Sequence, residues 1–301
     1  MAAGAAPASV GAMPKPIIAA VDPRANDRSA AALGALLARA TRAPLIVAGA
    51  YPVDRAVDDL YPEYARALRF DAERSLSRAG ATVAAVASLG SPARALHELA
   101  EREHARMLVI GASRRSTPGR AAPSAVTDRL LHGAPCPVAV APAGFRPDAG
   151  PLLAVGVAFN DMPDGRAALA AACELAARAR ATVRVLTVAE PLDRLVSGAL
   201  DGVALADAER ARAARAETTL QRGVDAVPHA LRGGGEILSG HPAEALAAVS
   251  EPLDLLVCGS RGYGPLQTLL VGSTAHALVR SAACPVLVVP RDSGHEVAEA
   301  A

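Results

Sequence analysis

The sequence is poor in aromatic residues and has almost no lysine. Of its 301 residues none is Trp, three are Phe and four are Tyr, so stacking platforms for the bases of single-stranded nucleic acid are scarce. Lys15 is the only lysine among 31 basic residues, and no glycine-rich loop contains the lysine that P-loop NTPases place on nucleotide phosphates. The P-loop class is therefore excluded. A net charge of +1 gives no electrostatic reason to expect nucleic acid or an anionic membrane as a partner.

Cysteines are few, and no two of the four form a CxxC pair. Cys136 and Cys284 each precede an apolar run and Cys258 ends one, so we expect buried thiols rather than a metal site or a disulfide framework. Residues 1–15 lack the basic segment and long apolar core of a signal peptide and are expected to be a disordered leader. Because no apolar run reaches the length of a membrane span, we expect a soluble cytoplasmic protein.

What the sequence does have is an internal repeat. Three segments of the first half recur in the second half at offsets of 148 to 150 residues. The pairs are SLGSPARALHELA (88–100) with LSGHPAEALAAVS (238–250), MLVIGASRR (107–115) with LLVCGSRGY (255–263), and APCPVAVAP (134–142) with AACPVLVVP (282–290). We therefore expect two copies of one domain, at 16–142 and 152–292, with a linker at 143–151 and a tail at 293–301.

Each copy alternates short apolar runs with stretches of helical periodicity. In the first copy the pattern predicts strands at 16–21, 44–50, 82–88, 107–111 and 137–141, and helices at about 28–42, 54–79, 92–104 and 125–132. In the second copy it predicts strands at 152–158, 182–188, about 229–238, 253–259 and 285–289, and helices at 164–180, about 203–222, 242–250 and 273–281. The runs 72–80 and 209–217 are interpreted as solvated helix faces. Strands that are apolar on both faces indicate an α/β fold, with two doubly wound parallel sheets covered by helices on both sides.

The stretch from Gly259 to Ser273, GSRGYGPLQTLLVGS, carries the most specific pattern. It follows an apolar strand, spaces Gly259, Gly262 and Gly272 as GxxGx9GS, and ends where a helix is expected to begin. Glycines let a backbone approach a ligand closely, and the free N–H groups of a helix N-terminus attract anions such as phosphate. Glycines after a strand also serve as ordinary turn residues, and Ser273 would suit a helix start without any ligand. The whole pattern resembles the nucleotide-binding signature of ATP-binding universal stress proteins.

That resemblance covers nearly all of 16–290 and implies a tandem member of the family, with five-stranded, Rossmann-like domains of the adenine nucleotide alpha hydrolase type and strand order 3-2-1-4-5. Ligands then bind at the carboxyl ends of the strands, where the winding reverses. The implied cofactor-binding residues of the second domain are Ala158 and Val188 as adenine walls, Asn160 where the family commonly has an aspartate, Gly259 beneath the ribose, and Arg261, Gly262, Gly272, Ser273 and Thr274 at the phosphates. Arg261 also fits an exposed loop charge.

The first domain matches the same signature less well. Asp22 stands at the family's aspartate position, where it can contact ligand or act as a turn residue, and Gly111 matches Gly259. At the 148-residue offset, however, Arg114 replaces Gly262 and Ser124 replaces Gly272, so side chains would crowd the phosphate cradle. Arginines in the first-domain loop could still hold an anion by charge or could simply be solvated. We expect the first domain to bind ATP weakly or not at all.

The family implies a protein of the stress response that binds ATP, AMP or ADP, with Mg²⁺ as an accompanying ion, and acts through nucleotide-dependent association rather than turnover. The histidines show no metal spacing and the carboxylates no acid-base pairing, so we expect no catalytic residues, no metal site and no enzyme. The two domains should pair through their last strands, and a homodimer of the chain is compatible with this pattern. Two alternatives stay open: an interaction scaffold that binds no nucleotide, and a slow ATPase or adenylyl transferase.

Overall fold

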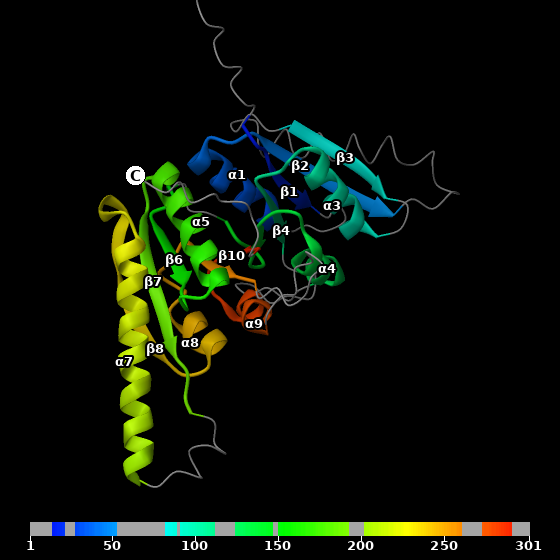
Figure 1. Cartoon of the computed structure of the whole chain (residues 1–301). Coiled ribbons are helices and arrows are strands. Elements are labelled where there is room, and N and C mark those ends of the chain that lie inside the picture. Colours follow the sequence, from blue (N-terminus) through cyan, green and yellow to red (C-terminus); the bar gives the residue numbers. More distant parts are fainter. Residues whose placement is uncertain are drawn as a thin grey trace, which may run out of the picture.

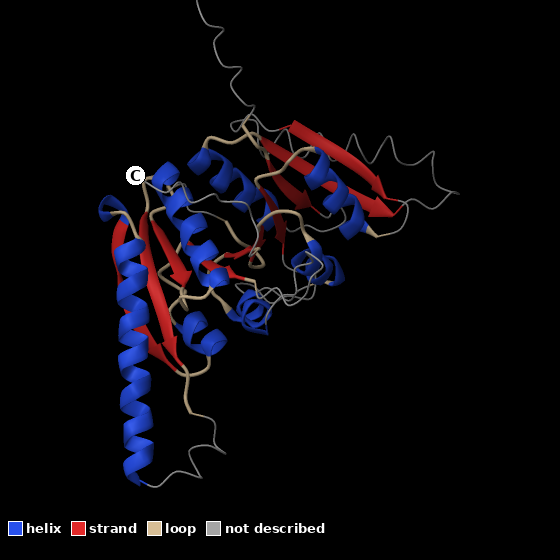
Figure 2. Cartoon of the chain, viewed as in Figure 1, coloured by secondary structure: helices blue, strands red, loops and turns tan. Residues whose placement is uncertain are grey.

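One ten-stranded β-sheet runs through both halves of the protein (Figure 1). The computed structural model describes residues 14–21, 28–52, 82–88, 91–111, 124–146, 150–192, 202–260 and 273–290. Helices cover both faces of this sheet, as Figure 2 shows in blue over the red strands. The expected α/β fold with two tandem domains is therefore confirmed.

The first domain contributes five parallel strands in the order β3-β2-β1-β4-β5. Its described elements are β1 (Ile17–Val21), α1 (Ser29–Thr41), β2 (Leu45–Pro52), β3 (Thr82–Ser88), α3 (Pro92–Arg102), β4 (Met107–Gly111), α4 (Ala125–Gly133) and β5 (Val138–Ala141). The expected strand order 3-2-1-4-5 is confirmed. The helix expected at 54–79 lies outside the described residues.

The second domain repeats this order as β10-β9-β6-β7-β8 read from the centre outward. Its elements are β6 (Ala154–Ala158), α5 (Pro163–Ala179), β7 (Thr182–Ala189), α7 (Gly202–Ala226), the 3-10 turn η2 (His229–Leu231), β8 (Arg232–Ser239), α8 (Pro242–Ala248), β9 (Leu255–Gly259), α9 (Ser273–Ser281) and β10 (Val286–Val289). Pro163 and Pro242 begin their helices, at the position where the fixed φ and missing N–H of proline fit.

The two domains join through their last strands, as the sequence predicts. β5 and β10 pair antiparallel with Ala139 opposite Leu287, two residues that are 148 positions apart and so hold the same place in each repeat. Beside this pair, the His276 Nε2 atom of α9 lies 3.1 Å from the Asp128 Oδ1 atom of α4. Asp128 and His276 are also equivalent by the 148-residue offset, which places an approximate two-fold axis at the seam between the domains.

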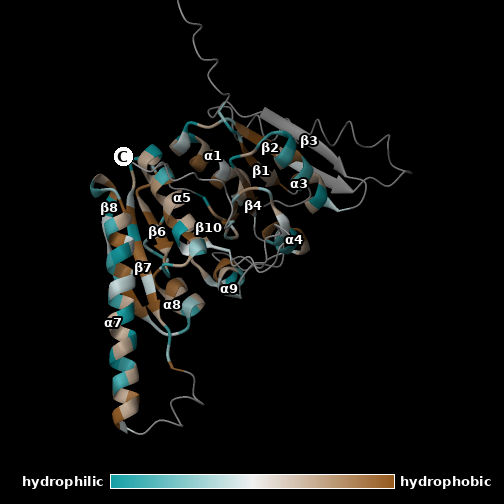
Figure 3. Cartoon of the chain, viewed as in Figure 1, coloured by the Kyte–Doolittle hydropathy of each residue, from teal (hydrophilic) through white to brown (hydrophobic). Residues whose placement is uncertain are grey.

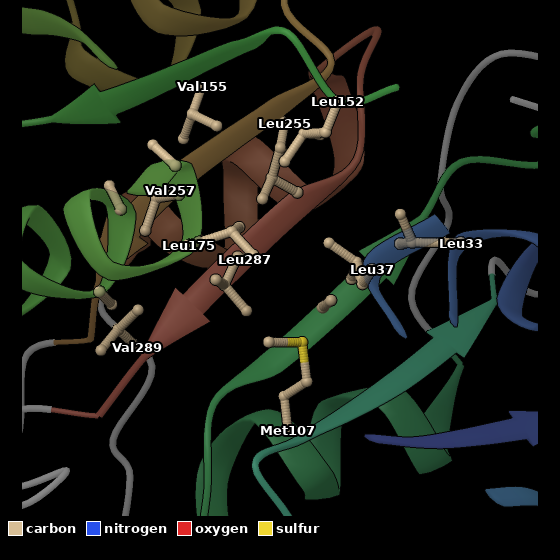
Figure 4. Packing of buried hydrophobic residues seen from close by; sticks show 14 of the residues in the cluster. Leu33, Leu37, Met107, Leu152, Val155, Leu175, Leu255, Val257, Leu287 and Val289 are labelled. Atoms are coloured by element: carbon tan, nitrogen blue, oxygen red, sulfur yellow. The ribbon is translucent and has the colours of Figure 1, made fainter. Parts of the chain in front are cut away.

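Side chains of each strand alternate between two hydrophobic cores, one on each face of the sheet. In β4, Met107 and Val109 face the core under α1 and α5, whereas Leu108 and Ile110 face the core under α3 and α4. Each core continues across the seam, and Figure 4 shows Leu37 of α1 in the same layer as residues of the second domain. The fold is therefore held by two layers of aliphatic packing that the period-two alternation of the strands creates.

β8 forms despite the run of glycines in its sequence, and packing against α7 explains why. A Cβ atom on Gly235 would lie 2.8 Å from Leu220 and 2.8 Å from Val224 of α7, so the helix rests directly on the strand backbone. Gly234 has a φ of +91°, and the pairing register with β7 shifts between Val183 and Val185. The glycines thus accommodate a bulge and a closely packed helix.

Helix α7 is 25 residues long and extends well past the ends of β7 and β8 (Figure 1). Ala216 and Gly223 are its only buried residues, and Figure 3 shows hydrophilic and hydrophobic residues alternating along its length. Within the described part of the chain, no helix combines the length and the apolar character needed to cross a membrane.

Candidate nucleotide-binding site

A cavity of about 520 Å³ opens in the second domain at the carboxyl ends of β6, β7 and β9. Ala158 at the end of β6, Val188 near the end of β7 and Gly259 at the end of β9 all line it, together with Thr274 of α9. The position lies where β6 is flanked by β7 on one side and β9 on the other, which is the crevice that open parallel sheets offer to ligands. With Asn160, which also lines it, the structure brings five of the sequence-predicted residues to one cavity.

Gly259 ends β9 at a point of very close backbone approach. A Cβ atom added there would lie 2.5 Å from the carbonyl carbon and 2.8 Å from the Cβ of Asp164 in the first turn of α5. Such separations are closer than real Cβ contacts, so only glycine lets α5 begin against the end of β9. Gly259 is therefore required by helix packing, whether or not a ribose lies above it.

The turn after β6 uses Asn160 as a local hydrogen-bond acceptor. Its Oδ1 accepts a hydrogen bond from the Met162 N–H at 3.1 Å, the pattern of an Asx turn leading into α5. Asn160 is exposed at the cavity mouth. Since the side-chain oxygen is engaged in the turn, the amide Nδ2 group is the part that Asn160 has available for a ligand.

Asp161, the next residue, ties the same turn to α7. It adopts a left-handed conformation with a φ of +55°. Its carboxylate meets the Arg166 Nε at 3.0 Å and the Arg222 Nη1 of α7 at 2.8 Å. The hydrogen bond from Arg222, followed by that from Arg166, holds the pKa of Asp161 below its ordinary value. This pair of contacts fixes α7 relative to the β6–α5 turn.

The phosphate end of the predicted site is described in part. Thr274 lies in the first turn of α9 and lines the cavity, whereas Ser273 begins the helix as an exposed residue. The first turn of α9, whose N–H groups have no partner within the helix, therefore borders the cavity. Four further predicted residues lie outside the described part of the chain: Arg261, Gly262, Gly272 and Asp22.

Helix α7 contributes cavity residues that the sequence reasoning missed. Arg212, Arg215 and Thr219 line the cavity, and Ala216 on the same stripe is buried. Neither arginine forms an ion pair with any described residue. The spacing 212, 215, 216, 219 is that of one helical face, and this regularity could have revealed an inward stripe in a run that we interpreted as solvated. Glu190, just past β7, is a further missed lining residue.

The one thiol in the cavity wall is chemically inert. Cys258 is fully buried in β9, and its burial raises its pKa to about 12, so it stays a neutral thiol at physiological pH. Cys136 and Cys284 are buried as expected, and burial raises the pKa of each to about 12. The expectation of buried thiols is confirmed for these three positions, whereas Cys173 on α5 is only partly buried.

Comparison with known proteins identifies the fold and the family. The profile of the Universal stress protein family matches residues 13–142 and 154–290. The chain belongs to this family. A universal stress protein of Thermus aquaticus is 42% identical over 83 residues, which make up 27% of this chain and 56% of that protein. One from Mycobacterium tuberculosis is 40% identical over 58 residues, 19% of this chain and 18% of that protein. These matches span about half or less of each curated relative.

Solved structures extend the similarity over both Usp domains. A putative universal stress protein from Pseudomonas aeruginosa superposes with a TM-score of 0.63 at 18% identity, covering 92% of this chain and 93% of that one. A universal stress protein from Archaeoglobus fulgidus gives 0.60 at 18% identity, covering 92% and 96%. The tandem arrangement of two Usp domains in one continuous chain therefore occurs in other members of the fold.

Proposed function

We propose that this universal stress protein binds an adenine nucleotide in its second domain and acts in the stress response by nucleotide-dependent association. The observation that carries the proposal is the cavity at the carboxyl ends of β6, β7 and β9, whose 520 Å³ lies in the usual range for small-molecule sites. Its walls combine apolar surface at Ala158 and Val188 with a helix N-terminus at Thr274. Those are the two chemistries that a base and a phosphate chain require.

Different residues of the cavity would contact different parts of the nucleotide. Ala158 and Val188 would sandwich the adenine, and the Asn160 amide would donate to the base or ribose. The first N–H groups of α9 and the Thr274 hydroxyl would receive the phosphates, which helix N-termini attract. A Mg²⁺ ion would come with the nucleotide, and Asp164 and Glu190 are the carboxylates among the residues that line this cavity.

Calorimetric titration of ATP, and separately AMP, into wild type and Gly272→Asp tests this proposal. The substitution places a carboxylate immediately before α9, where it would repel phosphate. We expect one site per chain in wild type and no measurable heat in Gly272→Asp. Equal ATP binding by wild type and Gly272→Asp would contradict the proposed site in the second domain. No binding by either, with no nucleotide released on denaturation, would favour an interaction scaffold.

The arginines of α7 offer a second and independent variant. Arg212→Ala combined with Arg215→Ala removes from the cavity wall two charges that have no ion-pair partner among the described residues, without touching the sheet. We expect ATP affinity to fall about tenfold, the loss of roughly one charge-assisted hydrogen bond. Arg210→Ala is the matched control, because Arg210 pairs with Asp207 on the exposed side of α7. A similar loss of ATP affinity in Arg210→Ala would contradict a direct contact between Arg212, Arg215 and the nucleotide.

Turnover is tested by phosphate release from purified protein. We propose that the site binds nucleotide without hydrolysing it, in keeping with the role in association that the family resemblance implies. We therefore expect phosphate to be released no faster than by the spontaneous hydrolysis of ATP in buffer. Release by wild type that disappears in Gly262→Arg would instead assign a slow ATPase to this cavity.

A further inference from the structure

A second cavity, of about 370 Å³, lies at the seam between the domains. It is bounded by the C-terminal ends of α1 and α5, which pack against each other (Figure 1), and by residues 150–152, which lead into β6. The nucleotide cavity lies at the other end of β6. The seam cavity is therefore a separate site, and the proposal below does not depend on nucleotide binding.

Four arginines line this cavity, two from each domain. Arg39 and Arg42 come from the end of α1, and Arg178 and Arg180 come from the end of α5. All four are exposed residues, and the cavity that they line lies between the ends of the two helices. Buried Leu36 and Leu152 form the apolar part of the lining.

The charges of these arginines are largely uncompensated. Among the residues that the structure describes, Arg39, Arg42 and Arg180 have no ion-pair partner. Arg178 lies 3.2 Å from Glu174, but that carboxylate is shared with Arg106 of the first domain, at 2.6 Å. The two helix C-termini supply only about half a negative charge each. Among the described residues, a positive excess therefore remains around this cavity.

Backbone geometry shows that two of the arginines occupy conformationally costly positions. Arg42 and Arg180 follow the last turns of α1 and α5 with φ values of +53° and +59°, in the left-handed region. In both turns the next N–H closes back on the helix, from Ala43 to Ala38 and from Ala181 to Ala176. Glycine is the usual residue at this helix-ending position because it lacks a Cβ. Both domains place an arginine there instead.

We propose that the seam cavity binds a compact oxyanion of the phosphate class that carries at least two negative charges. Guanidinium groups recognise phosphate oxygens through paired N–H donors, and the concave wall holds four such groups around one space. A bound anion would relieve the repulsion between arginines of different domains. It would thereby link the ends of α1 and α5, and so stabilise the tandem arrangement.

The test is calorimetric titration of inorganic tripolyphosphate into the full chain, together with thermal unfolding in its presence. The variant Arg42→Gly/Arg180→Gly removes two of the four charges and places at each position the residue that its backbone conformation favours. We expect this variant to unfold at the same or a higher temperature than wild type and to lose at least about tenfold in tripolyphosphate affinity. Loss of binding then has no explanation in misfolding.

Two matched proteins make the result specific. Arg210→Gln/Arg280→Gln removes the same net charge from exposed positions on α7 and α9 and should retain tripolyphosphate binding. Gly272→Asp disables the proposed nucleotide site and should retain it as well. Binding that is lost in Gly272→Asp alone, or lost equally in the exposed-arginine control, would overturn the seam site. Failure of wild type to bind tripolyphosphate would overturn it too.

Discussion

The two domains share a fold but begin their equivalent helices, α4 and α9, differently. In α4, the Ser124 Oγ accepts a hydrogen bond from the Thr127 N–H at 3.1 Å, so a side chain of the protein satisfies a free donor of the first turn. At the equivalent position before α9 the sequence has Gly272, which carries no side chain that could do the same. When a side chain of the protein already accepts a hydrogen bond from the first N–H groups of a helix, fewer of these groups are free to bind a phosphate. Under the proposed function, the start of α4 in the first domain would be structural, whereas the start of α9 in the second domain would receive the phosphates.

The glycines that end the fourth strands differ in the same direction. A Cβ atom on Gly259 would collide with the backbone of Asp164, whereas one on Gly111 would lie 3.7 Å from Ala30, an ordinary contact. The second domain therefore packs its first helix more tightly against the carboxyl end of the sheet. Only there does the strand end require glycine.

Substitution of these two glycines by alanine should give the largest difference between the domains. We expect Gly259→Ala to lower the free energy of unfolding by about 3 kcal/mol, because the added methyl group meets backbone that cannot move aside. Gly111→Ala should leave it within about 0.5 kcal/mol. Urea unfolding without nucleotide measures both. Equal effects would show that the tighter packing of the second domain is not required for stability.

Removal of the helix cap should have an intermediate effect. Ser124→Ala leaves the Thr127 N–H without its acceptor, and we expect a loss of about 1 kcal/mol in unfolding free energy. Ser273→Ala, at the exposed first residue of α9, is the control and should change stability by less than about 0.5 kcal/mol. Thermal or urea unfolding decides the matter. A loss of about 1 kcal/mol in the unfolding free energy of Ser273→Ala as well would contradict the proposed difference between the starts of α4 and α9.

The ion pairs of Asp161 should give the smallest effect, one that depends on pH. Its folded-state pKa is lowered by Arg222 and Arg166, so the stabilisation is present above the unfolded-state pKa of about 4 and disappears as pH falls through the folded value. We expect Asp161→Asn to cost under about 1 kcal/mol at pH 7, since both arginines are largely exposed. Asparagine tolerates the left-handed backbone, so the change isolates the charge.

Urea unfolding at pH 7 and near pH 3 measures this dependence. The difference between wild type and Asp161→Asn should shrink at the lower pH. A difference that stays constant with pH would mean that geometry, rather than charge, accounts for the loss.

Strand positions could be predicted because short apolar runs recur at the same spacing in both halves. β4 and β9 begin and end within about two residues of expectation, and α9 matches its predicted range of 273–281. β8 was harder to predict, since its glycines make no side-chain contacts of their own and are explained only by the approach of α7. The residues of β8 alone do not indicate that a helix from elsewhere in the chain will pack against them.

The site was predictable wherever a residue ends a strand or begins a helix. Ala158, Val188 and Thr274 follow from the family resemblance and from the rule that parallel sheets bind ligands at their carboxyl ends. Arg212 and Arg215 could not be placed by the same rule, because they lie on a long polar helix whose tilt over β7 decides which side chains reach the cavity.

By itself, the sequence determined the duplication, the alternation of strands and helices, and the identity of the glycine-rich second-domain signature. Each of these features can be recognised from the order and spacing of residues along the chain. Only the tertiary structure decided that Gly259 serves helix packing, that α7 arginines border the second-domain cavity, and that four arginines line a cavity at the seam. Those arrangements depend on which elements meet across the sheet, and chain folding brings together residues that no local pattern relates.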